Sequence, residues 1–187
     1  MRRGLLASGI IALLALPWMR QRMESAMIAH MLVQIPLLAG TGALMATALP
    51  ERWQSSLRAW NGNGVSGTLM ALGASTWWMV PRALDSALAS PAMEVAKFVT
   101  LPLLVGAPLS LSWSRLGGMG RGFMIANVLP MWAVVGWLYV AAPVRVCNFY
   151  LVEQQTTAGA GLLASSIALA VAVGCLAFRS RPSSSAA

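Results

Sequence analysis

The amino-acid sequence predicts an all-α membrane protein, a polytopic bundle of about six transmembrane helices. Of its 187 residues, 58% are hydrophobic, and the mean hydropathy is +0.70. Only 10% of the residues are charged, compared with about 25% in an ordinary soluble domain. The apolar residues form long continuous stretches. This pattern excludes the ~10-residue alternating strands of a membrane barrel, and so apolar a chain is not disordered.

Six apolar segments account for the predicted helices, because a span needs about 20 residues. The first segment follows Arg2 and Arg3 and is interpreted as an uncleaved anchor, with a cleaved signal peptide as the alternative. The third segment is short and ends at the pair Trp77-Trp78, which is typical of the membrane interface. We expect one transmembrane domain over residues 1–179 and a disordered tail over 180–187. The six segments are 4–19, 26–49, 64–80, 93–113, 123–143 and 158–178.

The charges predict an orientation in the membrane rather than a nucleic-acid partner. The 13 basic residues outnumber the 5 acidic ones, but they are scattered singly between apolar segments and form no basic stripe. Arginines gather in cytoplasmic loops, so the side richer in arginine, and with it both termini, is predicted to be cytoplasmic. That side carries Arg2, Arg3, Arg52, Arg58, Arg115, Arg121, Arg179 and Arg181, and the other carries Arg20, Arg22, Arg82 and Arg145.

No catalytic constellation is recognisable, and we expect the chain not to be an enzyme. The single histidine, His30, belongs to no Ser/His/Asp or Cys/His pattern, and one histidine cannot supply bis-histidine haem ligation. The two cysteines, Cys147 and Cys175, are predicted near opposite membrane faces and so are not expected to pair.

Soft metal ligands gather at the outer ends of the predicted helices. Methionines recur every four residues from Met19 to Met31, a spacing that places them on one face of a helix. Thioether and thiolate groups select Cu(I), and imidazole also suits copper. The alternative is that the methionines fill packing gaps and that the histidine is a hydrogen-bonded core residue. The candidate metal ligands are His30, Met27, Met31, Met79, Met93, Glu94 and Cys147.

Two charged pairs interrupt the apolar segments. Glu94 and Lys97 are three residues apart in one predicted helix and could pair there. Ionisable groups within a membrane span are costly and are functional candidates by default; the alternative is an interfacial position with the lysine extended toward water. Arg82 and Asp85 have the same spacing and are interpreted as a structural interfacial pair.

One stretch resembles the CtaG family of membrane proteins, which assist the assembly of cytochrome c oxidase and are linked to copper insertion. The family pattern is Trp-His-x-Pro-x-x-x-Asp-x-Ala-Leu. Here the matching residues are Trp78, Pro81, Asp85, Ala87 and Leu88, and Met79 stands at the histidine position.

Three further stretches resemble the family in the same order along the chain. The early motif His-Met-x-x-His-Met-Leu matches at Met27, His30, Met31 and Leu32, with Ala26 replacing the first histidine. A later stretch matches at Pro91 and Gly106, but Glu94 and Phe98 occupy its two histidine positions. The Asp-Gln-x-x-Ala-Gly motif matches at Gln155, Ala158 and Gly159, with Gln154 at the aspartate position.

The resemblance implies an assembly factor, a metallochaperone that handles or delivers Cu(I) at the outer face of a bacterial inner membrane. Of the family histidines that can be located, only His30 is retained, so the sequence leaves open whether any metal binds. Oxidase subunits would be the partners. Structural or contact roles are expected for Trp78, Pro81, Arg82, Asp85, Lys97 and Gln155.

Two other functions remain open. A non-catalytic accessory subunit of a larger membrane respiratory or copper-enzyme complex would use small residues for close helix packing, such as Gly40/Gly42, Gly67/Ala71 and the stretch 158–161. A small ion or proton-coupled transporter could use Glu94 and Lys97 as a relay, but such folds usually contain a repeat, and none is evident here.

Overall fold

The computed structural model describes residues 2–179, and this part of the chain is helical without any strand. The all-α prediction is thus confirmed, while the tail predicted over 180–187 lies outside the described residues. The elements in chain order are α1 (Arg2–Ala15), α2 (Pro17–Glu24), α3 (Met27–Ala29), the π-helical turn η1 (His30–Gln34), α4 (Ile35–Ala48), α5 (Glu51–Trp60), α6 (Val65–Met79), α7 (Pro81–Ala89), α8 (Pro91–Thr100), the π-helical turn η2 (Leu101–Gly106), α9 (Ala107–Trp113), α10 (Gly118–Ala141) and α11 (Val152–Arg179).

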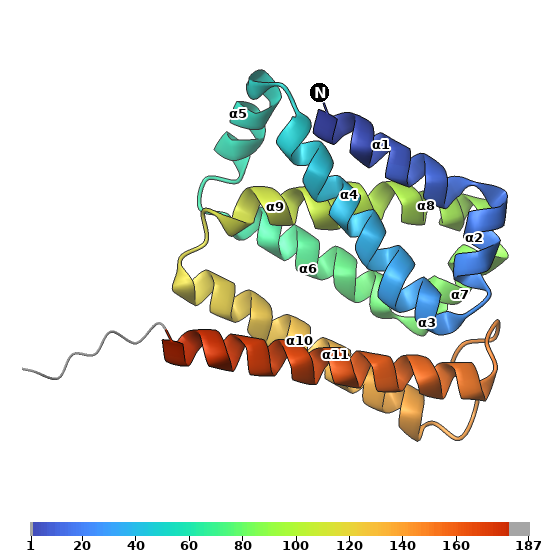
Figure 1. Cartoon of the computed structure of the whole chain (residues 1–187). Coiled ribbons are helices and arrows are strands. Elements are labelled where there is room, and N and C mark those ends of the chain that lie inside the picture. Colours follow the sequence, from blue (N-terminus) through green and yellow to red (C-terminus); the bar gives the residue numbers. More distant parts are fainter. Residues whose placement is uncertain (1, 180–187) are drawn as a thin grey trace, which may run out of the picture.

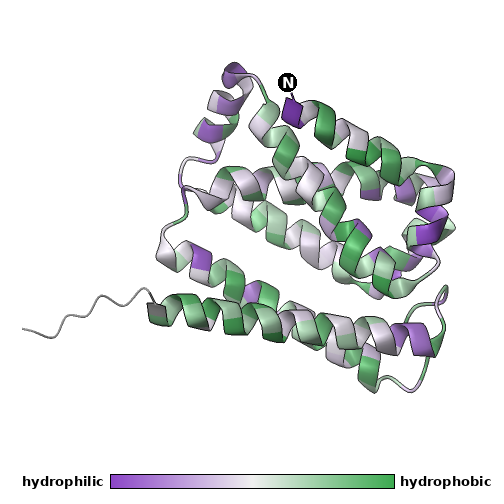
Figure 2. Cartoon of the chain, viewed as in Figure 1, coloured by the Kyte–Doolittle hydropathy of each residue, from purple (hydrophilic) through white to green (hydrophobic). Residues whose placement is uncertain are grey.

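Four helical segments within residues 2–179 are long and apolar enough to cross a membrane. They are Met27–Ala48, Pro91–Trp113, Gly118–Ala141 and Val152–Phe178, and the pair α1 and α2, bent by 72°, could supply a fifth. The predicted number of about six spans is therefore not confirmed. The helix α6, for example, has only 15 residues, fewer than the roughly 20 that a span needs. Figure 2 shows apolar residues along the helix shafts and hydrophilic ones gathered toward the ends of the bundle, as expected for a membrane protein.

Prolines set many of the helix boundaries. Pro17, Pro81 and Pro91 each open a helix, a position where the missing N–H has no partner to lose. Pro36 and Pro102 lie beside or within the two π-helical turns, because a proline cannot donate to the helical ladder and a widened turn accommodates the gap. The predicted segments 26–49 and 93–113 thus each form one continuous but locally widened helix.

The helices form two groups (Figure 1). One is the hairpin of α10 and α11, and the other contains α1, α4, α6 and the continuous α8–η2–α9 helix. A Cβ added to Gly159 would lie 2.7 Å from the carbonyl oxygen of Gly136, so these glycines let α10 and α11 touch backbone to backbone.

A second close crossing joins α4 to η2. A Cβ on Gly106 would overlap the carbonyl oxygen of Ala39, and a Cβ on Gly42 would overlap the carbonyl of Pro102. Gly40 differs, because a Cβ there would meet nothing within 4 Å. The small residues noted in the sequence are therefore used largely for packing within the chain, with Gly40 as an exception.

The helices and loops meet at two opposite ends of the bundle (Figure 1), and these ends differ in their charged residues. The network end comprises α2, α3, α7, the start of α8 and the loop 142–151. The arginine-rich end comprises the start of α1, α5, the α9–α10 turn and the end of α11. Among residues 2–179, the first end holds Arg20, Arg22, Arg82 and Arg145, and the second holds Arg2, Arg3, Arg52, Arg58, Arg115, Arg121 and Arg179.

Candidate functional site

The stretches singled out by the sequence meet at the network end. Met27 and Met31, from α3 and η1, pack in one hydrophobic core with Trp78 and Met79 from the end of α6 and with Cys147 from the loop 142–151. These segments are far apart in the chain, and the α10–α11 hairpin brings its loop back onto α7. The convergence makes this end the candidate functional site.

Lys97 is the charged residue at the centre of this end. Its side chain is fully buried, and its Nζ donates to Glu24 Oε1 at 2.6 Å, to Gln34 Oε1 at 3.3 Å and to His30 Nε2 at 3.3 Å. The three acceptors come from α2 and η1, whereas Lys97 itself belongs to α8. A buried ammonium needs such compensation, because an unpaired charge in an apolar interior is costly.

His30 is engaged through both ring nitrogens. Its Nδ1 lies 2.8 Å from the hydroxyl of Tyr150, and that hydroxyl donates to the backbone carbonyl of Glu24 at 3.0 Å. Because the hydroxyl proton goes to Glu24, Nδ1 must be the protonated nitrogen, and Nε2 accepts from Lys97. Glu24, Lys97, His30 and Tyr150 therefore close a ring of hydrogen bonds, which we call the buried network.

The buried network is joined to a second ion pair. Arg20 Nη1 lies 2.8 Å from Glu94 Oε2, and Arg20 Nε lies 3.9 Å from Glu24 Oε2. The sequence predicted that Glu94 and Lys97 could pair within one helix, and the structure pairs each with a residue of α2 instead. The sharp bend between α1 and α2 is the cause, since it turns α2 toward α8.

The loop 142–151 is fixed by two side chains. Asp85 Oδ2 accepts from the backbone N–H of Asn148 at 2.8 Å and from its Nδ2 at 3.0 Å. Gln155 Oε1 accepts from the N–H of Val146 at 2.8 Å, and its Nε2 donates to the carbonyl of Tyr139 at 3.2 Å. Asp85 was expected to pair with Arg82. It instead faces this loop, and Gln155 holds the loop from the start of α11.

The other predicted residues occupy different settings. Met27 and Met31 are buried in the core, whereas Met93 is partly buried against it. The methionine stripe from Met19 is not one helical face, because the chain breaks between α2 and α3 at Ser25 and Ala26. Trp78, expected at the interface, is buried and donates to Thr100 Oγ1 at 2.9 Å. Pro81 opens α7 and ends the path of α6.

Burial also governs the groups of the loop 142–151. Burial raises the pKa of the Cys147 thiol to about 11, and its Sγ lies 3.7 Å from the hydroxyl of Tyr139. Burial likewise raises the pKa of Tyr150 above its usual range, which keeps its hydroxyl protonated as the donor to Glu24. Near neutral pH, Cys147 is therefore a thiol and not the thiolate that binds metal best.

The raised pKa predicts how Cys147 reacts. In a Cys175→Ala variant, the rate of reaction with a small thiol reagent should rise about tenfold per pH unit from pH 7 to pH 10, since the thiolate fraction grows in that proportion below the pKa. The same chain unfolded in detergent should level off near pH 9. A rate for the folded protein that is already constant above pH 9 would contradict this account.

These contacts bear on copper binding. Among residues 2–179, no group of three or more His, Cys, Asp or Glu side chains is placed to hold a metal ion. The ammonium of Lys97 occupies the lone pair that His30 would offer, and Tyr150 occupies the other nitrogen. In this arrangement a metal could reach His30 only after Lys97 moves away.

Four members of this site were not identified from the sequence, namely Glu24, Arg20, Gln34 and Tyr150. In the sequence analysis, Arg20 entered only the arginine count that predicts the orientation in the membrane. Glu24 carried a usable signal, because it is one of only five acidic residues and lies three positions before Met27. Its pairing with Lys97 depends on the direction in which the chain turns at Pro17; the proline marks a helix boundary but does not specify that direction.

Comparisons of the chain with models of protein families, with curated proteins and with solved structures found no match.

Proposed function

We propose that this chain is a membrane-embedded assembly factor for a respiratory oxidase, and that it acts from the network end. One observation supports the proposal most strongly. The stretches that resemble the CtaG family lie far apart in the sequence, yet their residues, including His30, Trp78, Asp85 and Gln155, gather at one end of the bundle. A shared site is what a common function would require.

The distribution of arginines supports an orientation. The network end carries fewer arginines than the opposite end, and arginines concentrate on the cytoplasmic side. In a bacterial inner membrane, the network end would then face the periplasm and both termini the cytoplasm, as the six crossings predicted from the sequence would require. The proposal includes copper handling, in which the protein transfers Cu(I) as a cargo ion. His30 and the thioethers of Met27 and Met31 would bind this ion once Lys97 has moved away from His30.

A second candidate function is that of an accessory subunit that needs no metal. The observation that favours it is the engagement of both His30 nitrogens inside the protein. In that case the buried network serves to lock α2, η1 and α8 together, and the partners of the chain are membrane subunits of a respiratory complex.

Site-specific photo-crosslinking in the membranes of the native cell tests the proposal. A photoreactive residue at Leu151 or Phe149, both exposed at the network end, should capture a subunit of the oxidase. The matched position is Met119, which is 91% exposed at the arginine-rich end and should capture none. Oxidase products from Met119 alone, or none from any position, would contradict the proposal.

A further inference from the structure

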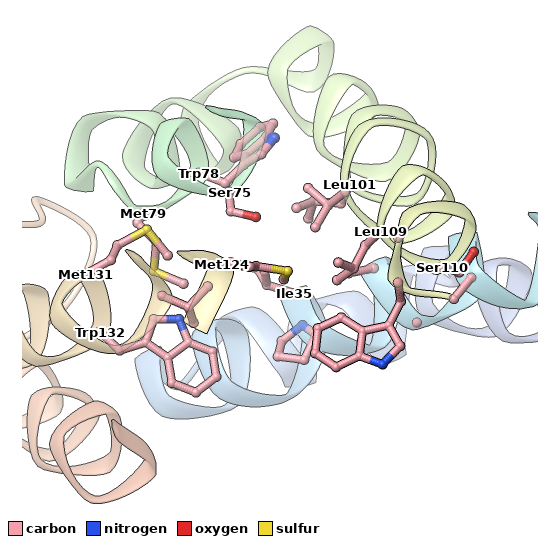
Figure 3. Close-up of a pocket in the computed structure, with 18 residues that line it drawn as sticks. Ile35, Ser75, Trp78, Met79, Leu101, Leu109, Ser110, Met124, Met131 and Trp132 are labelled. Carbon is pink, nitrogen blue, oxygen red and sulfur yellow. The ribbon is translucent and has the colours of Figure 1, made fainter. Parts of the chain in front are cut away.

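A large apolar groove lies where α10 packs beside the group formed by α4, α6 and α9. Its volume is about 610 Å³, and it is lined by side chains of α4, α6, η2, α9 and α10 (Figure 3). Its only lining residues with a polar side chain beyond tryptophan are Ser75 and Ser110. Figure 3 shows Met79 and Met131 at one end of the groove and Ser110 at the other. The size matches that of ligand sites, roughly 300–1,000 Å³.

A smaller and polar hollow adjoins the groove. Its volume is about 400 Å³, and Ser110 belongs to the lining of both hollows. The smaller one is also lined by Gln54 and Arg58 of α5 and by Ser114 and Arg115 of the α9–α10 turn. An apolar space among the helices is thus followed by a polar, basic space at the arginine-rich end.

The positive charge of this hollow is only partly neutralised. Arg115 Nη1 donates to the backbone carbonyls of Arg58 at 3.0 Å and Gly62 at 3.2 Å, and no ion pair of Arg115 is found in the described part of the chain. Arg58 pairs with Glu51, whose side chain is 76% exposed. Glu51 is the single acidic residue of the arginine-rich end as defined above, so the surroundings favour an anion.

We propose that the two hollows form one site for an anionic phospholipid of the membrane. One acyl chain lies in the apolar groove, and the phosphate group lies against Arg58 and Arg115. Basic pockets between transmembrane helices are suited to such headgroups, and the groove is suited to hydrocarbon by its apolar lining. A free phosphate ion would pair with the arginines but leave the apolar groove empty. A lipid without net charge would fill the groove but would not neutralise the arginines.

Native mass spectrometry of the full chain in mild detergent tests the headgroup. The probes are phosphatidylglycerol and phosphatidylcholine with identical acyl chains. Phosphatidylglycerol should be retained more strongly, and Arg115→Gln and Arg58→Gln should each weaken its retention about fivefold. Arg52→Gln is the matched control, because Arg52 lies on the same helix as Arg58 but does not line the hollow. Equal retention of the two lipids by the unmodified chain would overturn the proposal.

A larger side chain placed in the groove tests whether the groove holds the acyl chain. Gly40 lines the groove, and a Cβ there meets no neighbouring atom, so Gly40→Leu should occupy the space without disturbing the fold. Gly73→Leu is the matched control, since Gly73 has equally free surroundings but does not line the groove. Retention of phosphatidylglycerol should fall for Gly40→Leu alone. Unchanged retention in that variant, with inorganic phosphate displacing the lipid, would assign the site to a free anion and overturn the proposal.

Discussion

Replacing Lys97 with leucine is expected to destabilise the fold by about 3 kcal/mol, the lower end of the range for breaking a buried ion pair. The substitution removes the donor to Glu24, Gln34 and His30, and leaves the Glu24 carboxylate with two longer contacts, to Arg20 and to Nε2 of Gln34. Reversible unfolding of the purified chain in mixed detergent micelles, followed by helical circular dichroism, measures the change.

A second variant distinguishes the stability lost with the ion pair from the stability lost through altered packing. Lys97→Leu combined with Glu24→Gln removes both charges together, and we expect it to recover more than half of the lost stability, because a buried pair can be replaced by neutral groups at little cost. Arg52→Gln is the surface control and should change stability by less than about 0.5 kcal/mol. Equal destabilisation by the single and the double variant would mean that the pairing of Lys97 with Glu24 is not what holds α2 and α8 together.

Gly106→Ala is expected to destabilise the fold by at least about 3 kcal/mol, the upper end of the cost of overpacking. The added Cβ would overlap the carbonyl oxygen of Ala39, which belongs to the backbone of α4 and cannot rotate away. The helices α4 and η2 must then separate, and the core around Leu38 and Leu101 separates with them.

Gly40→Ala is the matched control for this prediction, because it adds the same methyl group to α4, the other helix of the crossing, at a position where nothing lies within 4 Å. It should be neutral or stabilising by up to about 1 kcal/mol, since alanine is the better helix former. The two variants are compared by unfolding under the same conditions. Similar stabilities would show that the crossing of α4 and η2 is looser than described.

The sequence predicted the fold class because composition and long apolar stretches depend little on tertiary detail. It also separated the two ends of the bundle, because arginines are placed by the membrane and not by packing. It did not predict the interruption between Met23 and Met27, nor the burial of Trp78, because helix breaks and side-chain partners are decided by neighbours distant in the chain.

In the candidate site, too, the sequence identified unusual residues but not their partners. His30 and Lys97 were recognisable as rare polar residues in apolar segments, and both lie in the buried network. The partner assigned to Lys97 by helical spacing was Glu94, and the structure supplies Glu24 instead. A spacing rule considers one helix at a time, whereas the α1–α2 bend brings a carboxylate from a different segment to 2.6 Å from the ammonium.

Anaerobic titration with Cu(I) against a chelator of known affinity tests the central claim most directly. We predict about one copper per chain, weaker binding for His30→Ala, and tighter binding for Lys97→Leu with Glu24→Gln, because that variant frees Nε2 of His30 for a soft metal. Met119→Ala, at the opposite end, should leave the affinity unchanged. No copper on any of these chains, or the same copper content with and without His30, would contradict copper handling at the network end and favour the accessory subunit.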